Sequence, residues 1–88
     1  MTAPWRTAWI TGASTGIGRE LAMQLAARGV RVAASARSAD KLDDLVRASS
    51  NIVAVPLDVT EAGDLRDAYV RIGKEIGTVD LAILNAGV

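Results

Sequence analysis

The chain of 88 residues contains no cysteine and no histidine. These two absences exclude a disulfide framework, a thiol nucleophile, an imidazole base and a zinc site built from the usual ligands. Ten basic and ten acidic residues give a formal net charge of zero, with no run of like charge. The charge pattern therefore indicates neither nucleic acid nor an acidic membrane surface as a partner.

Long apolar runs are also missing. No run reaches the roughly 18 residues of a membrane span, and Met1 to Arg6 lacks the hydrophobic segment of a signal peptide. We therefore expect a cytoplasmic protein that makes no membrane contact. Half of the residues are hydrophobic, which is typical of one small folded domain or of part of a larger one.

Strand-like segments alternate with helix-like segments along the chain. Apolar runs predict strands over residues 5–11, 30–36, 52–57 and 79–84. Helices are expected between them: the first from Ile17 to about Arg28, the second after an N-cap at Ser38, and the third after an N-cap at Thr60. Gly29 and Gly77 are expected to end the first and third helices. This order predicts an α/β fold with four parallel strands and three right-handed crossover helices.

Each expected helix carries an apolar stripe that should face the sheet. The stripes consist of Ile17, Leu21 and Leu25, then Leu42, Leu45 and Val46, and finally Leu65, Tyr69, Ile72 and Ile76. The third helix should lie on the opposite face from the first two, which leaves that face thinly covered and exposes an apolar edge on the fourth strand. We expect something else to complete the sheet.

A glycine-rich turn lies between the first strand and the first helix, where residues 11–18 read Thr-Gly-Ala-Ser-Thr-Gly-Ile-Gly. The first N–H groups of a helix have no backbone partner, and the positive end of the helix dipole lies beside them, so a pyrophosphate fits there. Gly12, Gly16 and Gly18 suit a turn with positive φ, a close approach of ligand to backbone, and close packing of helix on strand. An ordinary tight turn is the alternative.

Two further motifs follow later strands: Asp58 and Val59 after the third, and Asn85, Ala86 and Gly87 after the fourth. Together with the glycine spacing they resemble the short-chain dehydrogenase/reductase family, over nearly the whole chain. The resemblance implies a Rossmann-type sheet that binds a nicotinamide dinucleotide at the carboxyl ends of its strands. It also implies that residues 1–88 form the N-terminal, dinucleotide-binding part of a single domain, whose catalytic part lies outside this chain.

The same resemblance implies roles for single residues. Around the pyrophosphate and the adenosine ribose it places Ser14, Thr15, Gly16 and Ile17. Asp58 and Val59 would hold the adenine ring, although Asp58 could instead be a turn or helix-cap residue. Asn85, Ala86 and Gly87 would border the adenine-side ribose. Where the family commonly has another asparagine before this motif, the chain has Leu84.

The end of the second strand favours NADP over NAD. An NAD site normally carries an Asp or Glu about 20 residues beyond the glycine turn, where it receives the ribose 2′-hydroxyl. Ala36 occupies that place, and Arg37 follows it with donors that suit phosphate oxygens. Ser38, or the hydroxyl of Ser14, could add another donor. The alternative for Arg37 is a solvated surface residue.

Catalytic residues of the family are a Ser and a Tyr followed four residues later by a Lys, all beyond the fourth strand. Tyr69 is the only tyrosine in the chain, but Gly73 stands four residues later and Lys74 five. Five residues turn a helix by about 500°, so Tyr69 and Lys74 point in different directions. We therefore assign Tyr69 to packing, and Asp80, at the amino end of the fourth strand, to a turn.

The leading hypothesis is the cofactor-binding part of an NADP-dependent oxidoreductase that transfers hydride between NADPH/NADP and a small carbonyl or alcohol substrate. We expect a homo-oligomer, and we expect the 88 residues alone to be inactive. The alternative is a non-catalytic dinucleotide-binding module that acts as a sensor or partner. A Rossmann methyltransferase is disfavoured because it usually needs an acid near Ala36, and a P-loop nucleotidase is excluded because no Gly-Lys-Ser/Thr follows the glycines.

Overall fold

The computed structural model describes residues 4–14, 16–37, 39–58 and 62–84. Strands and helices alternate in the order that the sequence predicts. They are β1 (Thr7–Thr11), α1 (Gly16–Ala27), β2 (Arg31–Ser35), α2 (Ala39–Ala48), β3 (Ile52–Ala54), α3 (Ala62–Glu75) and β4 (Leu81–Leu84). The predicted α/β class is therefore confirmed, with strands that are shorter than their apolar runs.

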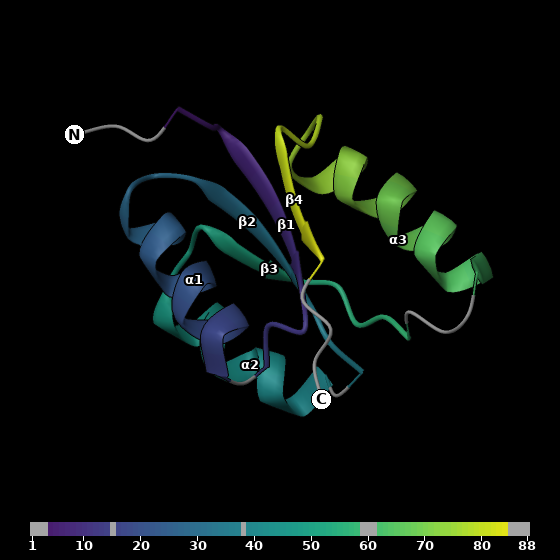
Figure 1. Ribbon diagram of the computed structural model, residues 1–88, viewed down its shortest axis with the longest axis horizontal. Helices are drawn as coiled ribbons and strands as arrows, with labels where there is room; N and C mark the ends of the chain where they lie inside the picture. The colour runs from purple at the N-terminus through teal and green to yellow at the C-terminus, as the bar shows by residue number, and fades with distance from the viewer. Residues whose placement is uncertain (1–3, 15, 38, 59–61, 85–88) are drawn as a thin grey trace.

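All four strands run parallel in the order β3-β2-β1-β4 (Figure 1). Thr11 lies opposite Ser35 of β2 and opposite Leu84 of β4, so these strands end at one level. Beyond β3 the backbone continues beside β2, because the Leu57 N–H donates to the Ala36 carbonyl at 3.0 Å. The carboxyl ends of the strands thus share one edge, from which the loops emerge.

The helices cover opposite faces of the sheet, with α1 and α2 on one side and α3 on the other (Figure 1). Successive side chains of a strand point to opposite faces, so Ile10 packs with Leu42 and Leu45 beneath the first pair of helices. Trp9 packs instead with Ile72 of α3. The predicted placement of the third helix is confirmed.

Two glycines end helices as predicted. Gly29 has φ 87° and Gly77 has φ 90°, a left-handed conformation that costs glycine little because it has no Cβ. The Gly29 N–H donates to the Ala26 carbonyl at 3.1 Å and closes the last turn of α1. The N-caps predicted at Ser38 and Thr60 lie outside the described residues.

The predicted stripe of α1 was wrong at its first residue, because Ile17 is 82% exposed. The residues of α1 that are buried are Gly18, Ala22, Leu25 and Ala26. One residue corresponds to a rotation of about 100° around a helix, and the small side chains bring the helix backbone close to the sheet. In α2 the stripe is confirmed at Leu42 and Leu45, whereas Val46 is 38% exposed.

The stripe of α3 is displaced in the same way. Ile72 and Ile76 are buried as predicted, but their partner one turn earlier is Ala68, and Leu65 is 39% exposed. Tyr69 is 58% exposed, so it does not fill the core. Its ring nevertheless contacts Trp9, with ring centroids 6.4 Å apart, so Tyr69 packs at the margin of the core.

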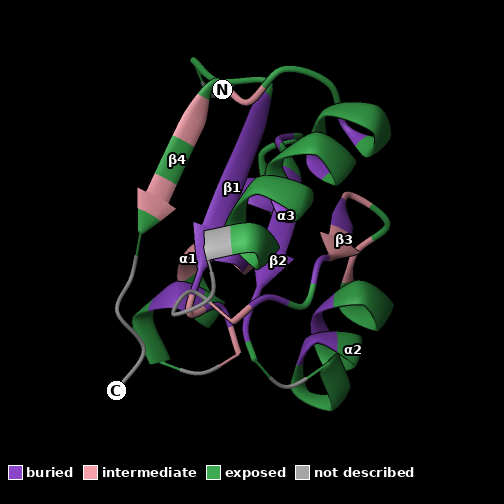
Figure 2. Cartoon of the chain, turned by 90° about the vertical axis from the view of Figure 1, so that its right-hand side faces the viewer, coloured by how far each residue is buried: buried purple, intermediate pink, exposed green. Residues whose placement is uncertain are grey.

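β4 forms one edge of the described sheet, with Ala82 and Leu84 exposed (Figure 2). The predicted exposed edge is confirmed. Among the helices that the structure describes, none is long and apolar enough to cross a membrane.

Candidate functional site

The glycine turn is tied to the carboxyl end of β2. After β1 ends at Thr11, Gly12 adopts φ 63°, and the chain bends so that the Ala13 N–H donates to the Ser35 carbonyl at 3.0 Å. Ala13 is fully buried and belongs to the core beneath α1 and α2. The turn is therefore an extension of the core, with a fixed position relative to the sheet.

Gly16 begins α1 in the left-handed region, with φ 59°. A Cβ built at Gly16 would meet no atom of the described residues within 4 Å, and the residue is exposed. The backbone at Gly16 thus faces open space, where a phosphate would find helix N–H groups. Gly18 is buried against the sheet, as close packing of helix on strand requires. These residues fit the pyrophosphate of a dinucleotide.

Two other predicted residues lie at the same edge. Ala36 is buried and Arg37, which follows it, is exposed. Asp58 is half-buried and follows Leu57, whose N–H is bonded to the Ala36 carbonyl. The register of the sheet therefore brings Arg37 and Asp58 to the edge that carries the glycine turn.

The structure also describes two further predicted site residues, Ser14 and Ile17, and the neighbouring Leu84. Ser14 is half-buried in the turn, and Ile17 is exposed in the first turn of α1. Leu84, the departure from the family pattern, is 74% exposed and lies opposite Thr11. The other predicted site residues lie outside the described part of the chain: Thr15, Ser38, Val59, Asn85, Ala86 and Gly87.

The opposite, amino-terminal edge holds Asp80 in a structural role. The Asp80 carboxylate accepts a hydrogen bond from the Arg6 N–H at 2.9 Å, and its own N–H donates to the Thr7 hydroxyl at 2.9 Å. That hydroxyl in turn donates to the Thr78 carbonyl. The prediction that Asp80 is a turn residue is confirmed, because these bonds join the starts of β1 and β4.

Side chains of the described residues offer little other chemistry. Tyr69 contacts Trp9 rather than a base, and Lys74 is exposed at the end of α3. No group of three Asp or Glu side chains within the described ranges could hold a metal ion.

Sequence reasoning missed Ser35 and Trp9. The Trp9 indole N–H donates to the buried Ser35 hydroxyl oxygen at 2.9 Å, while the Ser35 carbonyl holds Ala13 of the glycine turn. Ser35 stands out in the sequence as the one hydroxyl between Val30 and Ala36, but the sequence does not indicate Trp9 as its partner.

Comparisons with known proteins agree with one another. The family model described as short chain dehydrogenase matches residues 6–88. An uncharacterised oxidoreductase of Myxococcus xanthus is 43% identical over 96% of this chain, and the human dehydrogenase/reductase SDR family member 7 is 37% identical over 90%. A short-chain type dehydrogenase/reductase from Mycobacterium marinum has a similar structure, with a TM-score of 0.88 and 34% identity over 94% of this chain.

The match covers only part of each relative. It spans 35% of the Myxococcus protein, 26% of the human protein and 35% of the Mycobacterium structure. The hydroxysteroid dehydrogenase structure from Escherichia coli gives the same picture, with a TM-score of 0.85 and 37% of that chain covered. The fold is the parallel, Rossmann-type α/β sheet of these structures, and the chain belongs to the short-chain dehydrogenase/reductase family.

Proposed function

We propose that this chain is the cofactor-binding portion of an oxidoreductase that transfers hydride between NADPH/NADP and a small carbonyl or alcohol substrate. The observation that carries the proposal is the open backbone at Gly16, where a left-handed glycine begins α1 at the carboxyl edge of the sheet. Proteins of the family bind nicotinamide dinucleotides. In this proposal residues 1–88 are the N-terminal part of a single dinucleotide-binding domain.

The glycine turn would hold the pyrophosphate through backbone N–H groups, with the hydroxyls of Ser14 and Thr15 beside it. Asp58 and Val59 would hold the adenine ring. The adenine-side ribose would be bordered by Asn85, Ala86 and Gly87. When bound, the cofactor supplies a nicotinamide ring that accepts or donates hydride. The residues of this chain contribute binding and orientation.

The choice of NADP rests on Ala36 and Arg37. A carboxylate at the end of β2 would repel a 2′-phosphate, and the buried Ala36 brings none there. The exposed Arg37 has a planar guanidinium with several donors, which suits phosphate oxygens. Ser38 would add a hydroxyl. We therefore place NADP ahead of NAD.

We expect the proton-transfer groups and the substrate pocket to be supplied by polypeptide outside these 88 residues, which would bind cofactor without turnover on their own. Tyr69 supports this view, since its ring rests on Trp9 and the residue four positions later is Gly73. The proposal for the complete enzyme includes a homo-oligomer in the cytoplasm, acting on a small molecule.

The test is a calorimetric titration of the intact protein with NADPH and with NADH, which measures the dissociation constant for each cofactor. Arg37→Ala should raise the dissociation constant for NADPH about 10- to 150-fold, since a charge-assisted hydrogen bond contributes roughly 1.5–3 kcal/mol. The dissociation constant for NADH should change less than about twofold, because NADH has no 2′-phosphate. Equal losses for both cofactors would refute the phosphate role of Arg37.

Two further variants serve as controls for this result, one expected to leave binding unchanged and one expected to abolish it. Arg47→Ala removes another exposed arginine, at the end of α2, and should leave both dissociation constants unchanged. Gly16→Val places side-chain atoms in the open space before α1 and should abolish binding of both cofactors. Unchanged binding by Gly16→Val would show that the glycine motif is an ordinary tight turn and not a phosphate-binding site.

A further inference from the structure

The side chain and the carbonyl of Ser35 bind two different parts of the molecule. Its hydroxyl oxygen accepts a hydrogen bond from the Trp9 indole N–H at 2.9 Å. Its backbone carbonyl accepts the Ala13 N–H at 3.0 Å. Ser35 is also the last residue of β2, opposite Thr11 in the register. It therefore joins Trp9, in the core on the α3 face, to the glycine turn.

Burial makes the bond between Trp9 and Ser35 consequential. Ser35 is fully buried and Trp9 is only 6% exposed. Removing one partner of a buried hydrogen bond leaves the other unsatisfied, without water to replace it. The indole and the hydroxyl consequently fix each other's positions more firmly than an exposed pair would.

α3 holds the indole on its other side. Trp9 shares a core cluster with Ala68 and Ile72 of α3, and the ring of Tyr69 lies 6.4 Å from its own ring, centroid to centroid. The indole is thus held between α3 and the end of β2.

We propose that Trp9 and Ser35 are positioning residues for the glycine turn. They hold the end of β2 in the place where its carbonyl fixes the Ala13 N–H, so that the turn through Gly12 is formed before any ligand arrives. A preformed binding loop gains affinity because less conformational entropy is lost on binding. As far as the ligand is a dinucleotide, the inference rests on the proposed function.

The binding test uses a double-mutant cycle in the intact protein. Trp9→Phe removes the N–H donor and keeps an aromatic ring, and Ser35→Ala removes the acceptor. Each should raise the dissociation constant for NADPH about 3- to 10-fold, as expected for one buried hydrogen bond. The double variant should bind about as well as either single variant, since both changes break the same bond.

Ile72→Val is the matched control. Ile72 lies in the same cluster as Trp9 and is fully buried, so the variant loses stability but keeps both partners of the bond between Trp9 and Ser35. Measured well below the unfolding midpoint of every variant, its dissociation constant should stay within about twofold of wild type. An equal loss in Ile72→Val would overturn the proposal, because general loosening of the core would then explain the effect.

Amide hydrogen exchange tests the same inference without a ligand. The Ala13 amide should exchange about 3- to 10-fold faster in Trp9→Phe and Ser35→Ala. The Val32 amide, bonded to the Asn51 carbonyl at 2.8 Å near the other end of β2, should keep its rate. Unchanged exchange at Ala13, or equal acceleration at both amides, would refute the positioning role. Faster exchange at Ala13 in a protein that binds no dinucleotide would support the anchoring and overturn the proposed function alone.

Discussion

The two faces of the sheet are closed in different ways. Beneath α1 and α2, aliphatic side chains and alanines form the larger described cluster, which includes Ile10, Leu42 and Ala13 of the glycine turn. Beneath α3, the cluster is smaller and centres on Trp9. On the first face α1 comes close to the sheet because its buried residues include Gly18 and Ala22. The turn is thus supported by the better-filled face.

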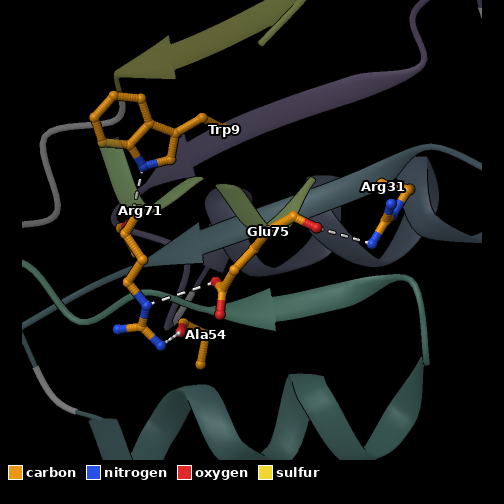
Figure 3. Close-up of polar contacts among 6 residues, drawn as sticks. Trp9, Arg31, Ala54, Arg71 and Glu75 are labelled. Atoms are coloured by element: carbon orange, nitrogen blue, oxygen red, sulfur yellow. Dashed lines mark hydrogen bonds and ion pairs between the residues drawn. The ribbon is translucent and has the colours of Figure 1, made fainter. Parts of the chain in front are cut away.

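The α3 face adds polar contacts at its margin. Arg31 donates to the Glu75 carbonyl at 3.1 Å, and Arg71 donates to the Ala54 carbonyl at 3.4 Å (Figure 3). Arg71 also pairs with the Glu75 carboxylate, one helical turn away, at 3.6 Å. These groups are exposed, and exposed pairs contribute little free energy. Among the described residues, α3 is therefore held by less apolar burial than α1 and α2.

The largest expected effect comes from opening a cavity in the first face. Leu45 is fully buried between α2 and the sheet, so Leu45→Ala should lower the free energy of unfolding by about 2–5 kcal/mol. Denaturant titration followed by circular dichroism measures the change. Val46→Ala, at the next position, where the side chain is partly exposed, should cost less than about 1 kcal/mol. Similar losses in the two variants would break the distinction between the filled core and its surface.

Element order and topology could be predicted from the sequence because they depend on strong local signals. Alternating apolar runs located the strands, and Gly29 and Gly77 marked the helix ends that their positive φ angles confirm. The predicted stripes failed at Ile17 and Leu65. Large apolar residues dominate a stripe in the sequence, whereas a helix packed closely on a sheet buries alanine and glycine instead. Rotation of a helix by one residue therefore escaped the prediction.

The candidate site was predictable where backbone chemistry defines it. Gly12 was predicted to have positive φ and has it, and Arg37 and Asp58 follow strands that end at the same edge. Gly16, which was predicted to allow close approach of a ligand, also has positive φ. The role of Ser35 was not predictable, because it depends on a bond to Trp9, 26 residues away in the sequence. Long-range contacts between side chains leave no periodic signal in a sequence.

A smaller effect is expected at the margin of the α3 face. Tyr69→Ala removes the ring that contacts Trp9 and should lower the free energy of unfolding by about 0.5–1.5 kcal/mol. Val70→Ala is the control, since Val70 is the next residue of α3 and is half exposed; its cost should stay within about 0.5 kcal/mol. Thermal and denaturant unfolding of both variants measure these two changes in the free energy of unfolding. If Val70→Ala costs as much, the aromatic pair adds nothing to the α3 face.

The smallest expected effect is a gain in stability. Gly73 lies within α3, has no positive φ and is exposed, and a Cβ built there meets no atom of the described residues within 4 Å. Gly73→Ala should therefore raise the free energy of unfolding by about 0.4–1 kcal/mol, because alanine restricts the unfolded chain and favours helix. The reinforced helix is the one that covers the weaker face.

Gly29→Ala supplies the matched contrast on the other face. Space is equally open around Gly29, but its φ of 87° is left-handed, and such a conformation costs alanine about 1–2 kcal/mol. The two substitutions add the same methyl group, so opposite shifts in the denaturation midpoint isolate backbone conformation as the cause. A loss of stability in Gly73→Ala would mean that another part of the protein packs closely against α3 at Gly73. It would contradict the open space found around that position.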